Sequence, residues 1–108
     1  MGTLPRRTPK RLPEKLREIR LRLGLSQNEM IRHMGLEGVL TREEVSSFEL
    51  GRRQPNLLTL WAYANAVNIY VDALILDEVD LPGALPSPVK SEGVQRTAKP
   101  KKGVKGSK

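Results

Sequence analysis

The chain has 108 residues, room for one domain, and no cysteine, which excludes a disulfide framework and a zinc site with cysteine ligands. Its net charge of +7 is uneven: residues 1–11 carry +4 (four basic side chains, no acidic ones), residues 12–80 carry −3 (eight basic, eleven acidic) and residues 81–108 carry +6 (seven basic, one acidic). No stretch is apolar for long enough to span a bilayer and residues 1–11 lack the pattern of a secretory signal, so we expect a cytoplasmic protein with no membrane partner.

Composition divides the chain into three parts. Residues 1–11, with two prolines and four basic side chains, are expected to form a flexible basic arm. Residues 12–80 show helical periodicity and are predicted to form an all-α domain of five short helices. Residues 81–108 are rich in Pro, Gly, Ser and Lys without periodicity, and we expect a disordered basic tail.

The first helix is predicted between Pro13 and Gly24. Proline suits the first turn of a helix, and glycine is the residue that most often ends one. Apolar residues recur before Gly24 at spacings of three and four: Leu12, Leu16, Ile19 and Leu23.

Two helix-start signals of the same design follow. Ser26 precedes Glu29 by three residues, and Thr41 precedes Glu44 by three residues. In each pair the hydroxyl can accept from the backbone N–H of the glutamate, while the glutamate reaches back to the N–H of the cap. With Gly35 and Gly51 as stops, the pattern predicts two short helices joined by a turn, the layout of a helix-turn-helix.

A fourth helix is predicted after Asn56, which can cap it, and Asn68 can end it. Its expected inner stripe consists of Leu57, Leu60, Ala64 and Val67. One of Trp61 and Tyr63 is expected in the core, and the other, with Leu58, could belong to a dimer surface. A short fifth helix is expected over residues 71–76.

In this order, the elements resemble the Cro/phage-repressor (xenobiotic-response-element) family of helix-turn-helix DNA-binding domains. The resemblance covers residues 12–76 and rests on four matching segments: residues 23–27 at the junction of the first two helices, residues 45–51 with the glycine stop, residues 55–69, and residues 72–74. It implies a compact five-helix bundle whose third helix, residues 41–50, enters the major groove of double-stranded DNA.

One segment departs from the family. Residues 36–40 add about four residues between the second and third helices, close to one helical turn. Either the second helix is extended or the turn bulges with Gly38 at its tip. Both alternatives could tilt the third helix.

The resemblance implies a set of DNA contacts. Arg42 and Glu43, in the first turn of the third helix, could meet base edges, Arg42 at guanine and Glu43 at cytosine. Glu43 is equally explained by the helix dipole, which favours an acid there. The other candidates, for bases or phosphates, are Gln27, Thr41, Ser46, Ser47, Arg52, Arg53 and Asn56; any of them could instead be a solvated polar residue.

Further residues receive structural interpretations. Arg20 and Glu49 occupy places that in the family often hold a partly buried ion pair, although each could face solvent. His33 has no partner cluster and is expected to be solvated. Asp77, Glu78 and Asp80 are expected to form a solvated acidic turn rather than a metal site.

The sequence therefore predicts a sequence-specific transcriptional regulator that binds DNA as a dimer, and whose basic arm and tail add salt-dependent attraction. An antitoxin that clasps a toxin, or a bridging coactivator that contacts a transcription factor, are the alternatives. An enzyme is not expected, since the chain has one histidine, no cysteine and no paired buried carboxylates. No cofactor and no metal are expected.

Overall fold

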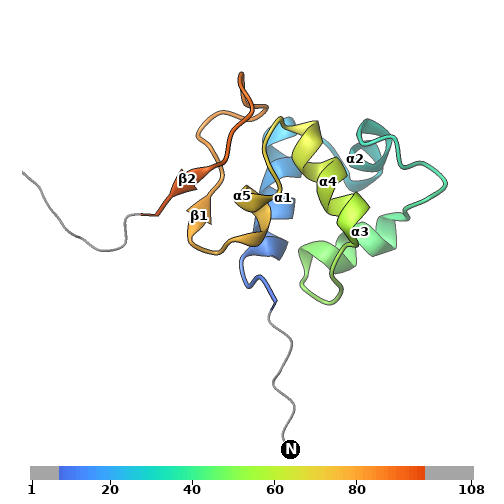
Figure 1. The fold of residues 1–108 in the computed structure, drawn as a ribbon. Coiled ribbons are helices and arrows are strands. Elements are labelled where there is room, and N and C mark those ends of the chain that lie inside the picture. The colour runs from blue at the N-terminus through green and yellow to red at the C-terminus, as the bar shows by residue number, and fades with distance from the viewer. Residues whose placement is uncertain (1–7, 97–108) are drawn as a thin grey trace, which may run out of the picture.

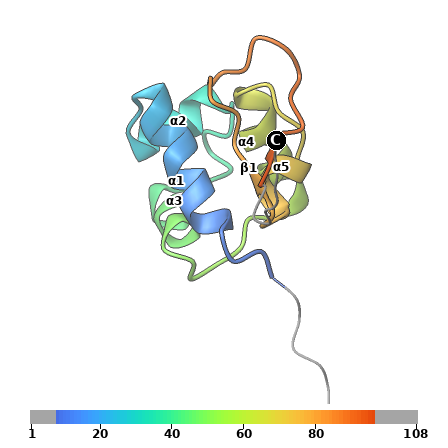
Figure 2. The same ribbon diagram turned by 90° about the vertical axis from the view of Figure 1, so that its left-hand side faces the viewer.

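The computed structural model describes residues 8–96, and within this range it confirms the predicted all-α domain of five helices. The helices are α1 (Leu12–Leu23), α2 (Gln27–His33), α3 (Arg42–Glu49), α4 (Leu57–Ala66) and α5 (Asp72–Ile75). A small antiparallel ribbon of β1 (Val79–Asp80) and β2 (Val94–Gln95) lies beside α5 (Figure 1). In Figure 2, α1, α2 and α3 lie on one side of the molecule, and α4, α5 and the ribbon lie on the other.

Both predicted capping boxes are present. The backbone N–H of Glu29 donates to Ser26 Oγ at 3.1 Å while Ser26 N–H donates to Glu29 Oε1 at 2.7 Å. At α3 the corresponding bonds between Glu44 N and Thr41 Oγ1 and between Thr41 N and Glu44 Oε1 measure 3.1 and 2.9 Å. These bonds satisfy N–H groups that the first turn of a helix leaves unpaired, so both helices begin where local chemistry places them.

The inserted turn bulges, and α2 does not extend into it. Gly35, just after α2, has φ 74°, a conformation that does not continue a helix. The carbonyl of Leu36 then accepts from the N–H groups of Val39 and Leu40, both at 3.0 Å, and Gly38 adopts φ 82°. Leu36 and Leu40 pack against the core, so the insertion is a single turn anchored at both ends.

The core is built from one face of each helix. Its buried members on the first three helices are Leu12, Leu16, Ile19, Met30, Ile31, Val45 and Phe48, and α4 adds Leu60, Tyr63 and Ala64. Of the two aromatic residues on α4, Tyr63 is therefore the buried one, while Trp61 is 56% exposed. The prediction that Leu57 is inside was wrong: it is 81% exposed, because Pro55 and Thr59 fill the inward positions at the start of α4.

A lysine lies in this core, which the sequence reading did not anticipate. Lys15 is 1% exposed, and its Nζ donates to the carbonyls of Ala73, Leu76 and Val79 at 2.9, 2.9 and 2.6 Å. Burial lowers the pKa of this ammonium, but the three carbonyls, from α5, the residue after it and β1, replace its hydration. Lys15 thereby fastens α1 to α5 and β1.

The part of the predicted flexible arm that the structure describes is attached to the domain. The backbone N–H groups of Lys10 and Arg11 donate to the Asp77 carboxylate at 3.1 and 3.0 Å, and the Arg11 guanidinium donates to Asp80 at 2.6 Å. Glu78 is exposed, as expected for a solvated acidic turn, whereas Asp77 and Asp80 are half-buried and also bond to these backbone N–H groups and to this cation. Residues 1–7 of the predicted arm lie outside the described residues.

The prediction that residues 81–96 belong to a disordered tail was also wrong. Ser87 N–H donates to the Val67 carbonyl at 2.9 Å, and Tyr70 N–H donates to the Ser91 carbonyl at 2.8 Å. Gly93 lies so close to β1 and α5 that a Cβ there would come within 2.5 Å of Val79 Cγ1. Residues 81–96 contain no helix, as their composition indicated. Their backbone groups nevertheless form hydrogen bonds with backbone groups of the domain. Residues 97–108 of the predicted tail lie outside the described residues.

Candidate nucleic-acid interface

Six of the nine residues predicted to contact DNA line one open depression of about 270 Å³. They come from three elements: the first residue of α2, the outer face of α3 and the loop after α3. The lining consists of Gln27, Arg42, Glu43, Ser46, Ser47 and Arg52. Helical spacing explains the α3 members, because residues at positions i, i+1, i+4 and i+5 share one side of a helix.

The acidic side chains of α3 differ in how strongly each would repel an anionic ligand. Glu44 is engaged by the cap of its own helix, and its other oxygen lies 3.6 Å from Arg53 Nη1. Glu49 points inward, with only 4% of its side chain exposed. Glu43 is the α3 acid that remains on the outer face, 3.8 Å from Arg42. Two of the three carboxylates of α3, those of Glu44 and Glu49, are therefore engaged by contacts within the fold.

Arg20 and Glu49 tie the back of α3 to α1, as the resemblance implied. The guanidinium donates to both carboxylate oxygens, at 2.7 and 2.9 Å, and a third donor nitrogen bonds the carbonyl of Leu25 at 3.0 Å. Hydrogen bonding to Glu49 raises the pKa of Arg20 above its ordinary value. The pair holds the surface of α3 in a fixed orientation relative to α1.

Gln27 connects this pair to the depression. Its side-chain amide donates to Glu49 Oε1 at 3.3 Å, and it is the first residue of α2, where backbone N–H groups are free of helix partners. The amide retains a second N–H. A phosphate approaching the start of α2 would thus meet backbone donors and an amide held in place by Glu49.

The remaining three predicted residues do not line this depression. Thr41 caps α3 and lines a neighbouring depression with Arg42. Asn56 caps α4, where its Oδ1 accepts from Thr59 N–H at 2.8 Å, so its amide nitrogen can still donate outward. Arg53 follows Arg52 in the loop after α3 and carries an exposed guanidinium.

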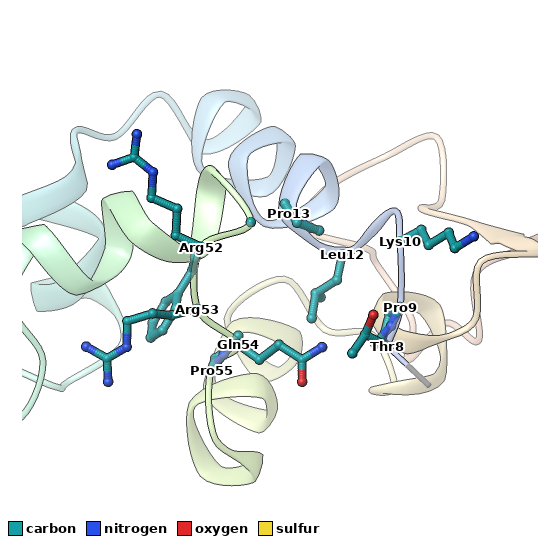
Figure 3. A pocket seen from close by; sticks show the side chains of 11 residues that line it. Thr8, Pro9, Lys10, Leu12, Pro13, Arg52, Arg53, Gln54 and Pro55 are labelled. Atoms are coloured by element: carbon teal, nitrogen blue, oxygen red, sulfur yellow. The ribbon is translucent and has the colours of Figure 1, made fainter. Parts of the chain in front are cut away.

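Arg52 and Arg53 also border a cleft of about 410 Å³ that the sequence did not indicate. Its floor includes Leu12 and Phe48, and residues 8–10 form its opposite wall. In Figure 3, Arg52 and Arg53 extend away from the cleft, and Gln54 reaches across it toward Thr8. The two arginines are thus directed outward from the loop, and residues 8–10, the part of the arm next to α1, lie beside that loop.

Sequence reasoning missed three polar groups near the predicted contacts. Lys10 is one, and the basic composition of the arm was the available signal. Asn28 and Arg32 on α2 are the others: they lie four residues apart, on one helical face, and line the depression that contains Thr41 and Arg42. Their spacing could have placed them on a common exposed face, but not beside α3.

His33 is exposed, as expected for a histidine without partners. Among residues 8–96, no three His, Asp or Glu side chains are grouped as they would be to hold a metal ion. Within the same range, no helix has both the length and the apolar character needed to cross a membrane.

Comparison with known proteins places most of the domain in a protein family. Residues 16–74, more than half of the chain, match the model of a family described as helix-turn-helix. The matched range begins in α1 and ends in α5, so it contains the six-residue depression and the Arg20–Glu49 pair. A search of curated proteins and a search of solved structures found no match.

Proposed function

The chain belongs to the Cro/phage-repressor type of helix-turn-helix family, and on this premise we propose that it is a sequence-specific DNA-binding transcriptional regulator. In this proposal α3 enters the major groove, and Arg42, Glu43, Ser46 and Ser47 meet base edges or the adjacent backbone. Gln27, Arg52, Arg53 and Asn56 hold phosphates on either side. The cytoplasmic location expected from the sequence is part of the proposal.

The observation that carries this proposal is the gathering of six contact candidates in one depression. Four are on α3, and the other two come from α2 and the loop after α3, separated from them by as many as twenty residues along the chain. A helix face that offers a guanidinium, a carboxylate and two hydroxyls carries donors and acceptors suited to the major-groove edges of bases. The flanking arginines and N–H groups supply the phosphate contacts that set the register.

We propose further that two copies bind together through an apolar patch on α4. Leu57, Leu58 and Trp61 are 81%, 78% and 56% exposed, and their spacing puts them on the outer side of that helix. Exposed apolar residues in such a cluster are typical of protein contacts. Changing Leu58 to Glu should dissociate the dimer in sedimentation experiments, whereas Leu21→Glu, at an exposed leucine on α1, should not.

The two alternative functions, an antitoxin and a bridging coactivator, both require a binding segment that is free to clasp a protein partner. The sequence left residues 81–108 available for this, and residues 81–96 of that stretch bond to the segment between α4 and α5 and pair with β1. Affinity capture from the producing cells distinguishes the cases. A toxin or a basal transcription factor retained in stoichiometric amount would replace the simple regulator with one of these two.

Selection of bound sequences from a random pool of duplexes tests the main proposal. We expect enrichment of one short site, arranged as two half-sites about one helical turn of DNA apart or a multiple of it. Recovery of an unselected mixture, with equal affinity for all duplexes, would overturn sequence-specific recognition. Recovery of a single unpaired half-site would keep recognition but overturn the dimer.

A further inference from the structure

The inserted turn builds a second depression beside the one that contains most of the predicted contacts. It has a volume of about 270 Å³, and its walls are α2, the turn over residues 36–40 and the start of α3. Arg42 lines both depressions, so they are neighbours on one surface. Without the bulge at Gly38, α2 and α3 would be joined directly and this depression would lose one wall.

Its polar groups include a cation that is held by the insertion itself. Arg32, on α2, donates from Nε to Glu37 Oε2 at 3.1 Å. Both side chains are largely exposed, 64% for Arg32 and 65% for Glu37. An ion pair so accessible to water is weakly held, and a stronger anion can displace the carboxylate.

The location of Arg32 relative to α3 suggests which anion that would be. Two sugar-phosphate backbones border the major groove, so a helix in the groove has phosphates on both sides. Arg52 and Arg53 follow the C-terminal end of α3. Arg32 lies beside its N-terminal end, where Asn28 and Thr41 add hydrogen-bonding groups.

We propose that this depression seats a backbone phosphate of bound DNA, with Arg32 as its principal donor, and that Glu37 weakens the contact by competing for the same guanidinium. The proposal rests on the proposed DNA-binding function and adds to it a site created by the insertion. A guanidinium can grip a phosphate with two parallel N–H bonds, which the single bond to Glu37 leaves possible. In this proposal the inserted turn adjusts the affinity for DNA through Glu37 and Arg32, independently of the base sequence.

Binding of the full chain to a short random duplex, measured by fluorescence anisotropy over a salt series, tests this site. Arg32→Gln should weaken binding and reduce the slope of log K against log salt by about 0.9, the value of one phosphate contact. When the salt concentration rises from about 50 to about 200 mM, both proteins lose affinity. The factor by which Arg32→Gln loses affinity should be roughly 3.5-fold smaller than the factor for the wild type. Glu37→Gln should strengthen binding and steepen the slope.

Two comparisons make the result specific. Glu18→Gln removes the same charge from another exposed pair, with Arg22 at 3.3 Å, and should change neither affinity nor slope appreciably. In a chain that already carries Arg32→Gln, the change Glu37→Gln should lose most of its effect, because Glu37 acts through Arg32.

Each other outcome counts against the proposal. An unchanged slope for Arg32→Gln, with wild-type binding intact, overturns the site and leaves the proposed function standing. An equal gain from Glu37→Gln in both backgrounds shows general charge repulsion in place of competition, and overturns the role of Glu37. A wild-type chain that binds no duplex overturns this inference together with the proposed function.

Discussion

Arg20 on α1 and Glu49 at the end of α3 form a two-point ion pair, with nitrogen–oxygen distances of 2.7 and 2.9 Å and side chains only 13% and 4% exposed. Bidentate geometry and burial make this pair the principal polar link between the two helices. The same carboxylate accepts from Gln27 at the start of α2, so three elements of the helix-turn-helix meet at one acid.

Changing Glu49 to Ala should therefore destabilise the domain by roughly 3–5 kcal/mol, because Arg20 would remain buried without a counter-charge. Chemical denaturation of the full chain measures this. Replacing both residues by apolar ones, Arg20→Met with Glu49→Leu, should recover most of the loss. A small effect of Glu49→Ala, comparable with that of Glu18→Gln, would contradict the assigned burial of the pair.

Arg42 is expected to contact a base, whereas Arg53 is expected to contact a phosphate. If Arg42 grips a guanine, Arg42→Ala costs about 1–3 kcal/mol on the selected site and much less on random DNA. Arg53→Ala and Gln27→Ala should weaken both duplexes nearly equally, and Arg53→Ala should lower the salt slope by about one unit. Competition binding with the two duplexes gives these values. Equal losses for Arg42→Ala would make it an anchor, and the reading role would pass to Thr41, Glu43 or Ser47.

Gly93 tests the packing of residues 81–96. It has φ 85°, and an added Cβ would come within 2.5 Å of Val79 Cγ1 and 2.7 Å of the Asp80 carbonyl oxygen. Gly93→Ala should cost roughly 2–4 kcal/mol through backbone strain and overpacking. Gly83→Ala, where nothing lies within 4 Å of the new methyl, is the matched control and should be nearly neutral in thermal unfolding. Similar melting temperatures for the two variants would argue against the packed segment.

Removal of residues 97–108 should affect DNA binding without affecting the fold. This stretch carries five lysines and no acid, so its loss should weaken binding to all duplexes by a similar factor and flatten the salt slope. Ending the chain at Asp80 should in addition lower the melting temperature, because β2 and the bonds of Ser87 and Ser91 would be lost. If the protein that lacks only residues 97–108 preferred a different DNA site, those residues would have to read bases.

Asp77 should contribute a pH-dependent part of the stability. Backbone N–H groups of Arg11 and Lys10 stabilise the ionised carboxylate and lower its pKa below the ordinary value of 3.8. Because the folded pKa is the lower one, the contribution is fully present above pH 3.8 and is lost as the pH falls through the folded pKa. Asp77→Asn should cost about 1 kcal/mol near neutral pH. The difference from the wild type should shrink in acid unfolding curves, and a constant difference down to low pH would refute the assignment.

The sequence by itself determined the features that depend on residues three or four positions apart. Ser26 with Glu29 and Thr41 with Glu44 specify the starts of α2 and α3, because cap bonds form within a single helical turn. The α1 stripe and the stops at Gly24, Gly35 and Gly51 are local in the same sense. Where the family pattern applied, it also paired Arg20 with Glu49, although these residues are 29 positions apart.

Only the tertiary structure decided what depends on distant residues meeting. Lys15 bonds carbonyls 58–64 positions away, Arg11 meets Asp80 across 69 positions, and residues 81–96 pair with backbone groups that no composition reveals. Leu57 fits the inner stripe by spacing, yet Pro55 and Thr59 take the inward positions. The shape of the inserted turn followed from packing as well, since Leu36 and Leu40 enter the core and leave Glu37 outside, beside Arg32. Local hydrogen bonds can be read along the chain, whereas burial depends on which surfaces meet once the chain is folded.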